Sequence, residues 1–268
     1  RNGLAPLSTF AMVTAPGVVT HSCTWVYVVQ GILVTYFLLL AYRILKRRRQ
    51  RINLIFSLFF LSIISAFILN MIYAAIPPAP PQINETIILI LYLCANFFVI
   101  FGPIFILIVH MIILESTIIY SVKRQNRFII LYGIVLLSAM LTLVILGIRF
   151  DEPDNPFLGI DLTPAVGKIP QWGLVFCISM LSIMSVFSII PIIRTSLKIY
   201  SSFETEALKK KWLYYFVGSF GLIIMFYFML IDNLYLGDVF RTITLILGVS
   251  VVFWGYLMYY GIGFKLKE

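Results

Sequence analysis

Seven long apolar runs restrict what this chain can fold into. Each reaches the roughly 20 residues that a helix needs to cross the hydrocarbon core of a bilayer. They cover residues 25–44, 52–76, 87–114, 128–148, 174–193, 212–234 and 239–262. Backbone polar groups in hydrocarbon must be paired within their own segment, so each run is predicted to be a helix. Charged residues make up only 12% of the chain, too few to cover a water-exposed surface.

The distribution of Lys and Arg between the loops predicts the orientation. If the runs cross alternately, 16 basic residues lie on one side and 4 on the other. The poorer side holds Arg1, Arg149, Lys168 and Arg241. Because cytoplasmic loops carry the excess of basic residues, the richer side is predicted to be cytoplasmic. The N-terminus is then outside and the C-terminus inside.

The expected fold is an all-α membrane protein, a bundle of seven transmembrane helices in the cell membrane. Residues 1–24 form an extracytoplasmic tail, residues 25–264 the helical domain, and residues 265–268 a short cytoplasmic end. Pro103 and Pro191 are expected to kink the third and fifth helices, since proline removes a helical hydrogen bond. The longest outer connection, 149–172, is rich in Pro, Gly and Asp and is expected to be an irregular loop.

Polar residues within the apolar runs are the candidate functional residues, because lipid makes them costly. Six of them gather in the predicted outer half of several helices: Gln30, Asn70, Tyr92, Asn96, Asp232 and Arg241. Asp232 and Arg241 flank a short connection, so we expect the two charges to pair facing the bundle interior. The sharper interpretation is an outward-open cavity for a small ligand. The plainer one is hydrogen bonding between helices and anchoring at the interface.

His110 is the one histidine inside an apolar run, in the inner part of the third helix. A structural histidine is the simpler reading, and proton sensing is a weaker candidate role. Small residues that recur in the last three helices, such as Gly218, Gly221, Gly248 and Gly255, are typical of close helix packing.

No constellation typical of an enzyme is found in the sequence. There is no HExxH motif, no pair of intramembrane aspartates and no glycine-rich phosphate loop, and Cys23, Cys94 and Cys177 lack metal-type spacing. We therefore expect no catalytic activity, no metal and no cofactor.

The basic inner loops favour membrane lipids over nucleic acid as partners. They are short and adjoin the predicted membrane boundary, where Lys and Arg attract the anionic inner leaflet. The residues expected to bind it are Arg47, Arg48, Arg49 and Lys210.

Several features resemble the seven-helix N-terminal sensor region of prokaryotic histidine kinases. They are a basic turn after the first helix (46–51), Gly102-Pro103 within the third, an amphipathic stretch before the sixth (203–212), and a short basic end (265–268). The chain departs from that family because its sixth helix has no internal proline. The Ile-, Phe- and Leu-rich style is also similar to uncharacterised archaeal seven-helix membrane proteins.

The sequence therefore favours a receptor-like or sensory module. It would respond to an unknown small ligand, or to membrane state, from the outer side and pass a helix shift to a cytoplasmic signalling partner. The alternative is a small transporter or channel, which needs polar residues that continue through the inner half of the bundle.

Overall fold

The structure is a computed structural model of the 268-residue chain. It describes the backbone of residues 19–47, 50–76, 81–119, 121–151, 156–163, 169–234 and 238–262. Side chains are described for residues 27–46, 50–76, 85–115, 121–151, 156–161, 170–234, 243–244 and 247–262.

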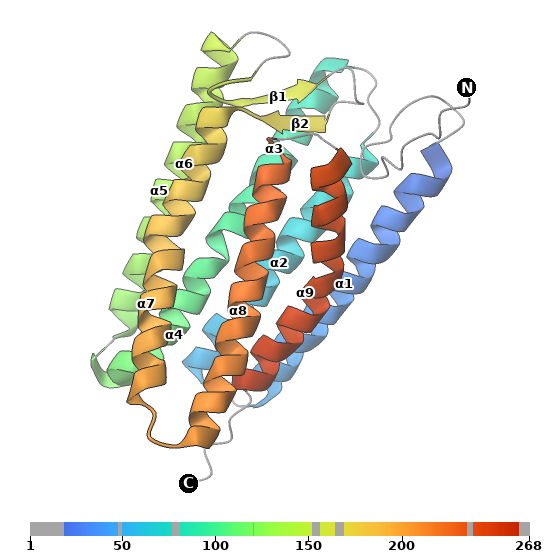
Figure 1. Ribbon diagram of the computed structural model, residues 1–268. Coiled ribbons are helices and arrows are strands. Elements are labelled where there is room, and N and C mark those ends of the chain that lie inside the picture. Colours follow the sequence, from blue (N-terminus) through green and yellow to red (C-terminus); the bar gives the residue numbers. More distant parts are fainter. Residues whose placement is uncertain are drawn as a thin grey trace.

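Helices make up nearly all of this part of the chain and lie side by side as a bundle (Figure 1). In chain order they are α1 (Val19–Arg47), α2 (Arg51–Ala75), α3 (Pro81–Phe101), α4 (Pro103–Ile119), α5 (Val122–Phe150), α6 (Leu174–Met184), the π-helical turn η2 (Ser185–Ile189), α7 (Ile190–Ser202), α8 (Glu206–Asp232) and α9 (Asp238–Ile262). Because α3 continues into α4, and α6 through η2 into α7, they form seven rods. The predicted helices are all found, and most extend several residues beyond their apolar runs.

Six of these rods are long and apolar enough to cross a membrane. The described part of α9 adds a shorter apolar helix, Leu247–Ile262. Large apolar side chains also remain exposed along the bundle, for example Ile134, Ile145 and Ile148 on α5. Such a surface is suited to lipid and not to water. The protein is therefore a helical, multi-pass membrane protein.

Two of the rods are interrupted at about mid-length, as the two prolines predict. Gly102 separates α3 from α4, and the Phe105 amide bonds the Gly102 carbonyl, one residue short of α-helical spacing. Before Pro191, the Ile190 amide bonds the Ser185 carbonyl, which is the wider spacing of a π-helix. A π-turn commonly appears where a helix must accommodate a local irregularity. Both interruptions divide a rod into two α-helical segments.

The expectation of an irregular loop over 149–172 is wrong for part of that connection. Strands β1 (Ile160–Thr163) and β2 (Ile169–Trp172) form an antiparallel hairpin, with Ile160 opposite Trp172. The hairpin lies at the end of the bundle where α5 ends and α6 begins (Figure 1). Pro and Gly in the sequence obscured strands of only four residues.

A carboxylate fixes the start of this hairpin to α5. Asp151 follows the helix, and its side chain accepts the amide of Leu158 at 2.9 Å and that of Gly159 at 2.8 Å. Gly159 in turn lies against Gly147. A Cβ added at Gly147 would lie 2.5 Å from the Cα atom of Gly159. Glycine is required at this crossing because the two backbones touch.

We expect Asp151→Ala to detach the hairpin from α5. Hydrogen bonds to a charged group contribute about 1.5–3 kcal/mol, and the variant leaves two backbone amides without their acceptor. Faster proteolytic cleavage within the 156–172 segment, with the helical circular dichroism unchanged, would report the loss. Arg149→Ala, which alters an exposed side chain of the same helix end, is the control. Equal cleavage rates for both variants would contradict this role.

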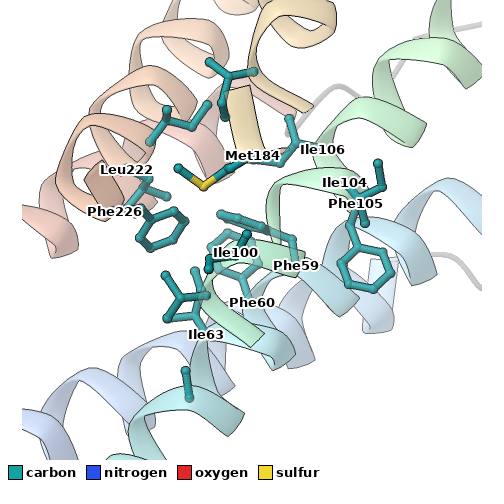
Figure 2. Close-up of a cluster of buried hydrophobic side chains, with 14 of the residues drawn as sticks. Phe59, Phe60, Ile63, Ile100, Ile104, Phe105, Ile106, Met184, Leu222 and Phe226 are labelled. Atoms are coloured by element: carbon teal, nitrogen blue, oxygen red, sulfur yellow. The ribbon is translucent and has the colours of Figure 1, made fainter. Parts of the chain in front are cut away.

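A core of aromatic and branched side chains fills the centre of the bundle. Figure 2 shows Phe59 and Phe60 of α2 beside Ile100 of α3, Met184 of α6 and Phe226 of α8. Both interrupted rods are thus held in place by packing against α2 and α8. The core lies between the two ends of the bundle.

Candidate functional site

A group of polar and aromatic side chains lies beneath the hairpin, at the predicted outer end of the bundle. Tyr92 of α3 is buried, and its ring packs edge-on against Tyr73 of α2 with centroids 5.7 Å apart. The polar groups close to the Tyr92 hydroxyl are Asn96, Trp172 and, at longer range, Asp232. We call Tyr73, Tyr92, Asn96, Trp172 and Asp232 the outer cluster. It joins residues from α2, α3, β2 and α8.

Trp172 is the member of the outer cluster that the sequence did not predict. It is fully buried, and its ring packs against Phe176 of α6 at 4.9 Å. Its backbone amide donates to the carbonyl of Asn233 at 2.9 Å, which ties β2 to the end of α8. The sequence placed this residue at the end of a loop, with no periodicity to indicate that it turns inward.

Two hydrogen-bond donors of the outer cluster are not satisfied within the described residues. The Tyr92 hydroxyl and the Trp172 indole nitrogen are buried there without a partner in hydrogen-bonding geometry. An unmade bond of this kind costs about 1–3 kcal/mol, so native proteins seldom retain one without a reason. Two such donors near a carboxylate are suited to holding a small polar ligand.

The structure brings together three of the six residues that the sequence selected: Tyr92, Asn96 and Asp232. The Asn96 amide donates to the Tyr92 carbonyl of its own helix at 2.9 Å, leaving its side-chain oxygen for other partners. Asp232 is half-buried at the last residue of α8.

The other three selected residues are not placed in the outer cluster. Gln30 is buried on α1, and its side-chain oxygen has no partner among the described residues. Asn70 is half-buried near the end of α2. The side chain of Arg241 lies outside the described residues, so its pairing with Asp232 stays a prediction.

Polar side chains in the inner half mostly bond to their own helices. Ser57 donates to the Leu54 carbonyl, Ser62 to Phe59, and Ser219 to Tyr215, at 2.7–2.8 Å. Each of these hydroxyls has therefore donated its proton within its own helix.

His110 is surrounded by aromatic rings in this inner half. Its imidazole is fully buried on α4, with the rings of Trp212 and Tyr215 of α8 at 5.1 and 5.4 Å. Its Nδ1 lies 3.2 Å from the Thr195 hydroxyl of α7. His110 therefore contacts two other rods, α8 and the one that contains α7. Glu115, five residues further along the chain, pairs with Arg124 at 3.7 Å.

The described part of the chain contains no group of three His, Cys, Asp or Glu side chains that could bind a metal ion. At the opposite end from the hairpin, Arg51 donates to the side-chain oxygens of Gln125 and Asn126 at 2.6 and 2.5 Å. This contact joins α2 to the start of α5. Arg51 thus has a structural role among the basic residues of that end.

Comparison with known proteins adds no relative. The chain matches no protein-family model, no curated protein and no solved structure. Function is therefore inferred from the residues alone.

Proposed function

We propose that the protein is a receptor-like or sensory module of the cell membrane that responds from the outer side to a small ligand or to membrane state. The observation that carries this proposal is the outer cluster, in which Tyr92 and Trp172 present unsatisfied donors beside Asp232. Buried polar groups at membrane depth are costly and commonly functional.

The proposed orientation places the hairpin outside, and it places the end of α1, the start of α8 and the end of α9 on the basic side. Seven crossings are favoured because α9 has 25 residues, about 37 Å at 1.5 Å per residue, enough for a core of about 30 Å. Sixteen of the 20 Lys and Arg residues then lie inside.

Reporter fusions test this orientation. Alkaline phosphatase is active only after export, so insertion within residues 77–85 or 152–168 is expected to give high activity, and fusion after Lys267 almost none. A cytoplasmically active reporter at the same positions should give the reverse pattern. Phosphatase activity after Lys267 would contradict both the orientation and the odd number of crossings.

Transmission to the inner side is supported by the two interrupted rods. Tyr92 and Asn96 lie on α3, directly before the break at Gly102, and Trp172 precedes α6, which leads to the π-turn. Hinges in membrane helices occur at such breaks. A ligand that draws Tyr92 and Trp172 together would change the angles at which α4 and α7 leave the breaks.

The experiment starts from a panel of amino acids, amines, short carboxylic acids and monosaccharides. Each compound is added to the protein in nanodiscs, and thermal unfolding identifies those that stabilise it. Spin labels at Lys123 and Lys198, with the three cysteines replaced by alanine, then report the distance between α5 and α7. We expect a stabilising compound, or a change of bilayer thickness, to change that distance. An unchanged distance in every condition would overturn the proposal, and uptake of the compound into proteoliposomes would favour a transporter.

Anionic lipids are the second proposed partner, through Arg47, Arg48, Arg49 and the exposed Lys210. Each basic residue near the surface contributes about 1 kcal/mol to binding. Replacing all four by glutamine, with Arg51 kept, is expected to reduce the phosphatidylserine retained in native mass spectrometry. A second variant, with the exposed Lys123 and Arg127 of another inner segment replaced by glutamine, serves as the comparison. It shows whether any loss of basic charge reduces the phosphatidylserine that is retained. Full lipid retention by the fourfold variant would contradict this assignment.

A further inference from the structure

The hydrogen bonds of Thr195 indicate which nitrogen of His110 carries its proton. The Thr195 hydroxyl lies 2.7 Å from the carbonyl of Pro191 and 3.1 Å from that of Ile192, both in its own rod. A hydroxyl has one proton to donate, and these carbonyls can only accept. Toward His110 Nδ1, at 3.2 Å, the Thr195 oxygen therefore acts as the acceptor. These bonds favour the His110 tautomer that is protonated at Nδ1, which leaves the lone pair at Nε2.

The Nε2 lone pair of His110 has no hydrogen-bond donor among the described residues. The Nε2 atom itself is buried there. The Tyr215 hydroxyl, whose ring packs against the imidazole, is also buried there without a partner in hydrogen-bonding geometry. The Ser219 side chain lies near that hydroxyl, but its own proton is donated to the Tyr215 carbonyl at 2.7 Å. Among the described residues, the Nε2 lone pair, a lone pair of the Ser219 oxygen and the Tyr215 hydroxyl proton thus lie close together without a partner in hydrogen-bonding geometry.

We propose that His110, Tyr215 and Ser219 form a second binding site, an internal site for one water molecule between α4 and α8. The water donates to Nε2 and to the Ser219 oxygen and accepts from the Tyr215 hydroxyl. Buried waters typically make about three hydrogen bonds to groups that are otherwise unsatisfied. The three partners are of the right kinds to satisfy both protons and one lone pair of the water.

The position of this site gives it a role in the packing of the rods. Through His110 and Thr195 the water connects α8 to α7 just after the π-turn and Pro191. A bridging water keeps polar groups satisfied over a range of distances that a direct bond does not allow. The site lets α8 shift against α4 without leaving a polar group exposed to hydrocarbon.

Nitrogen NMR of histidine tests the proposal in bilayers. The chain has two histidines, so His21→Gln leaves His110 as the only labelled one. We expect a protonated Nδ1, an unprotonated Nε2 displaced toward the hydrogen-bonded range, and magnetisation transfer from water to Nε2. Tyr215→Phe removes one partner of the water, and the Nε2 signal is expected to shift toward the value of a free acceptor.

Tyr214→Phe is the matched control, since Tyr214 is the adjacent residue and packs against Tyr260 instead. It is expected to leave the Nε2 signal unchanged. A proton on Nε2, or no transfer from water, in the His21→Gln protein would overturn the proposal without any further variant. The same shift from both tyrosine variants would also overturn it.

Discussion

Gly218→Leu is expected to destabilise the protein by about 3 kcal/mol or more, because the backbones of α8 and α9 touch at this position. An added Cβ at Gly218 would lie 2.5 Å from the Met258 nitrogen and 2.6 Å from the Trp254 carbonyl oxygen. Neither backbone atom can move aside as a flexible side chain can. Gly261 makes the reciprocal contact, where a Cβ would meet the Tyr215 backbone nitrogen at 2.4 Å.

Gly31→Leu on α1 provides the matched control. Apart from the neighbouring backbone of α1, no heavy atom of the described residues lies within 4 Å of a Cβ built at Gly31, so the same change is expected to cost less than about 0.5 kcal/mol. Both variants are compared by thermal unfolding in one detergent. Equal unfolding temperatures would mean that α8 and α9 are not in backbone contact.

The glycines show what helix periodicity predicts and what it leaves open. Spacing indicated that Gly218, Gly221, Gly248 and Gly255 favour close packing, and three of the four lie in tight contacts. Gly248 does not, since its nearest neighbour is the Met225 side chain at 4.0 Å. A small residue permits close approach, but only the arrangement of the rods decides where it occurs.

The helices were predictable for a stronger reason than the hairpin. Hydrocarbon forces a long apolar run to satisfy its own backbone, so its secondary structure follows from composition. The four-residue strands have no such constraint. They form because Asp151 and Gly159 fix the chain against α5, which depends on contacts between separate segments.

The sequence predicted those members of the outer cluster that interrupt an apolar run, and it missed the member that lies outside such a run. Tyr92, Asn96 and Asp232 were selected because polar residues in an apolar run stand out. Trp172 was missed because it follows a polar loop, and its inward direction depends on the bond to Asn233. Similarly, His110 stood out in the sequence, but its partners Trp212 and Tyr215 resembled ordinary interface and core aromatics.

The outer cluster makes the prediction that bears most directly on function. For a compound that stabilises the wild-type protein, Asp232→Asn and Asn96→Leu are expected to abolish the change in distance between Lys123 and Lys198. Loss of a hydrogen bond involving a charged group costs about 1.5–3 kcal/mol, which weakens binding by about 10- to 100-fold. The variants should keep the wild-type helical content, because Asp232 is the last residue of α8 and Asn96 bonds only to its own helix in the described contacts.

A comparison of two tyrosine variants distinguishes loss of ligand contact from a general loss of packing. Tyr92→Phe removes one unsatisfied hydroxyl and keeps the ring that contacts Tyr73. Without a ligand it should be neutral or slightly stabilising, since a buried donor without a partner is removed. With the compound present it should lose affinity, whereas Tyr256→Phe, at an exposed ring on α9, should change neither property. If Tyr92→Phe binds the compound as tightly as wild type, the hydroxyl does not contact the ligand, and the outer cluster is a packing arrangement that holds the hairpin on the bundle.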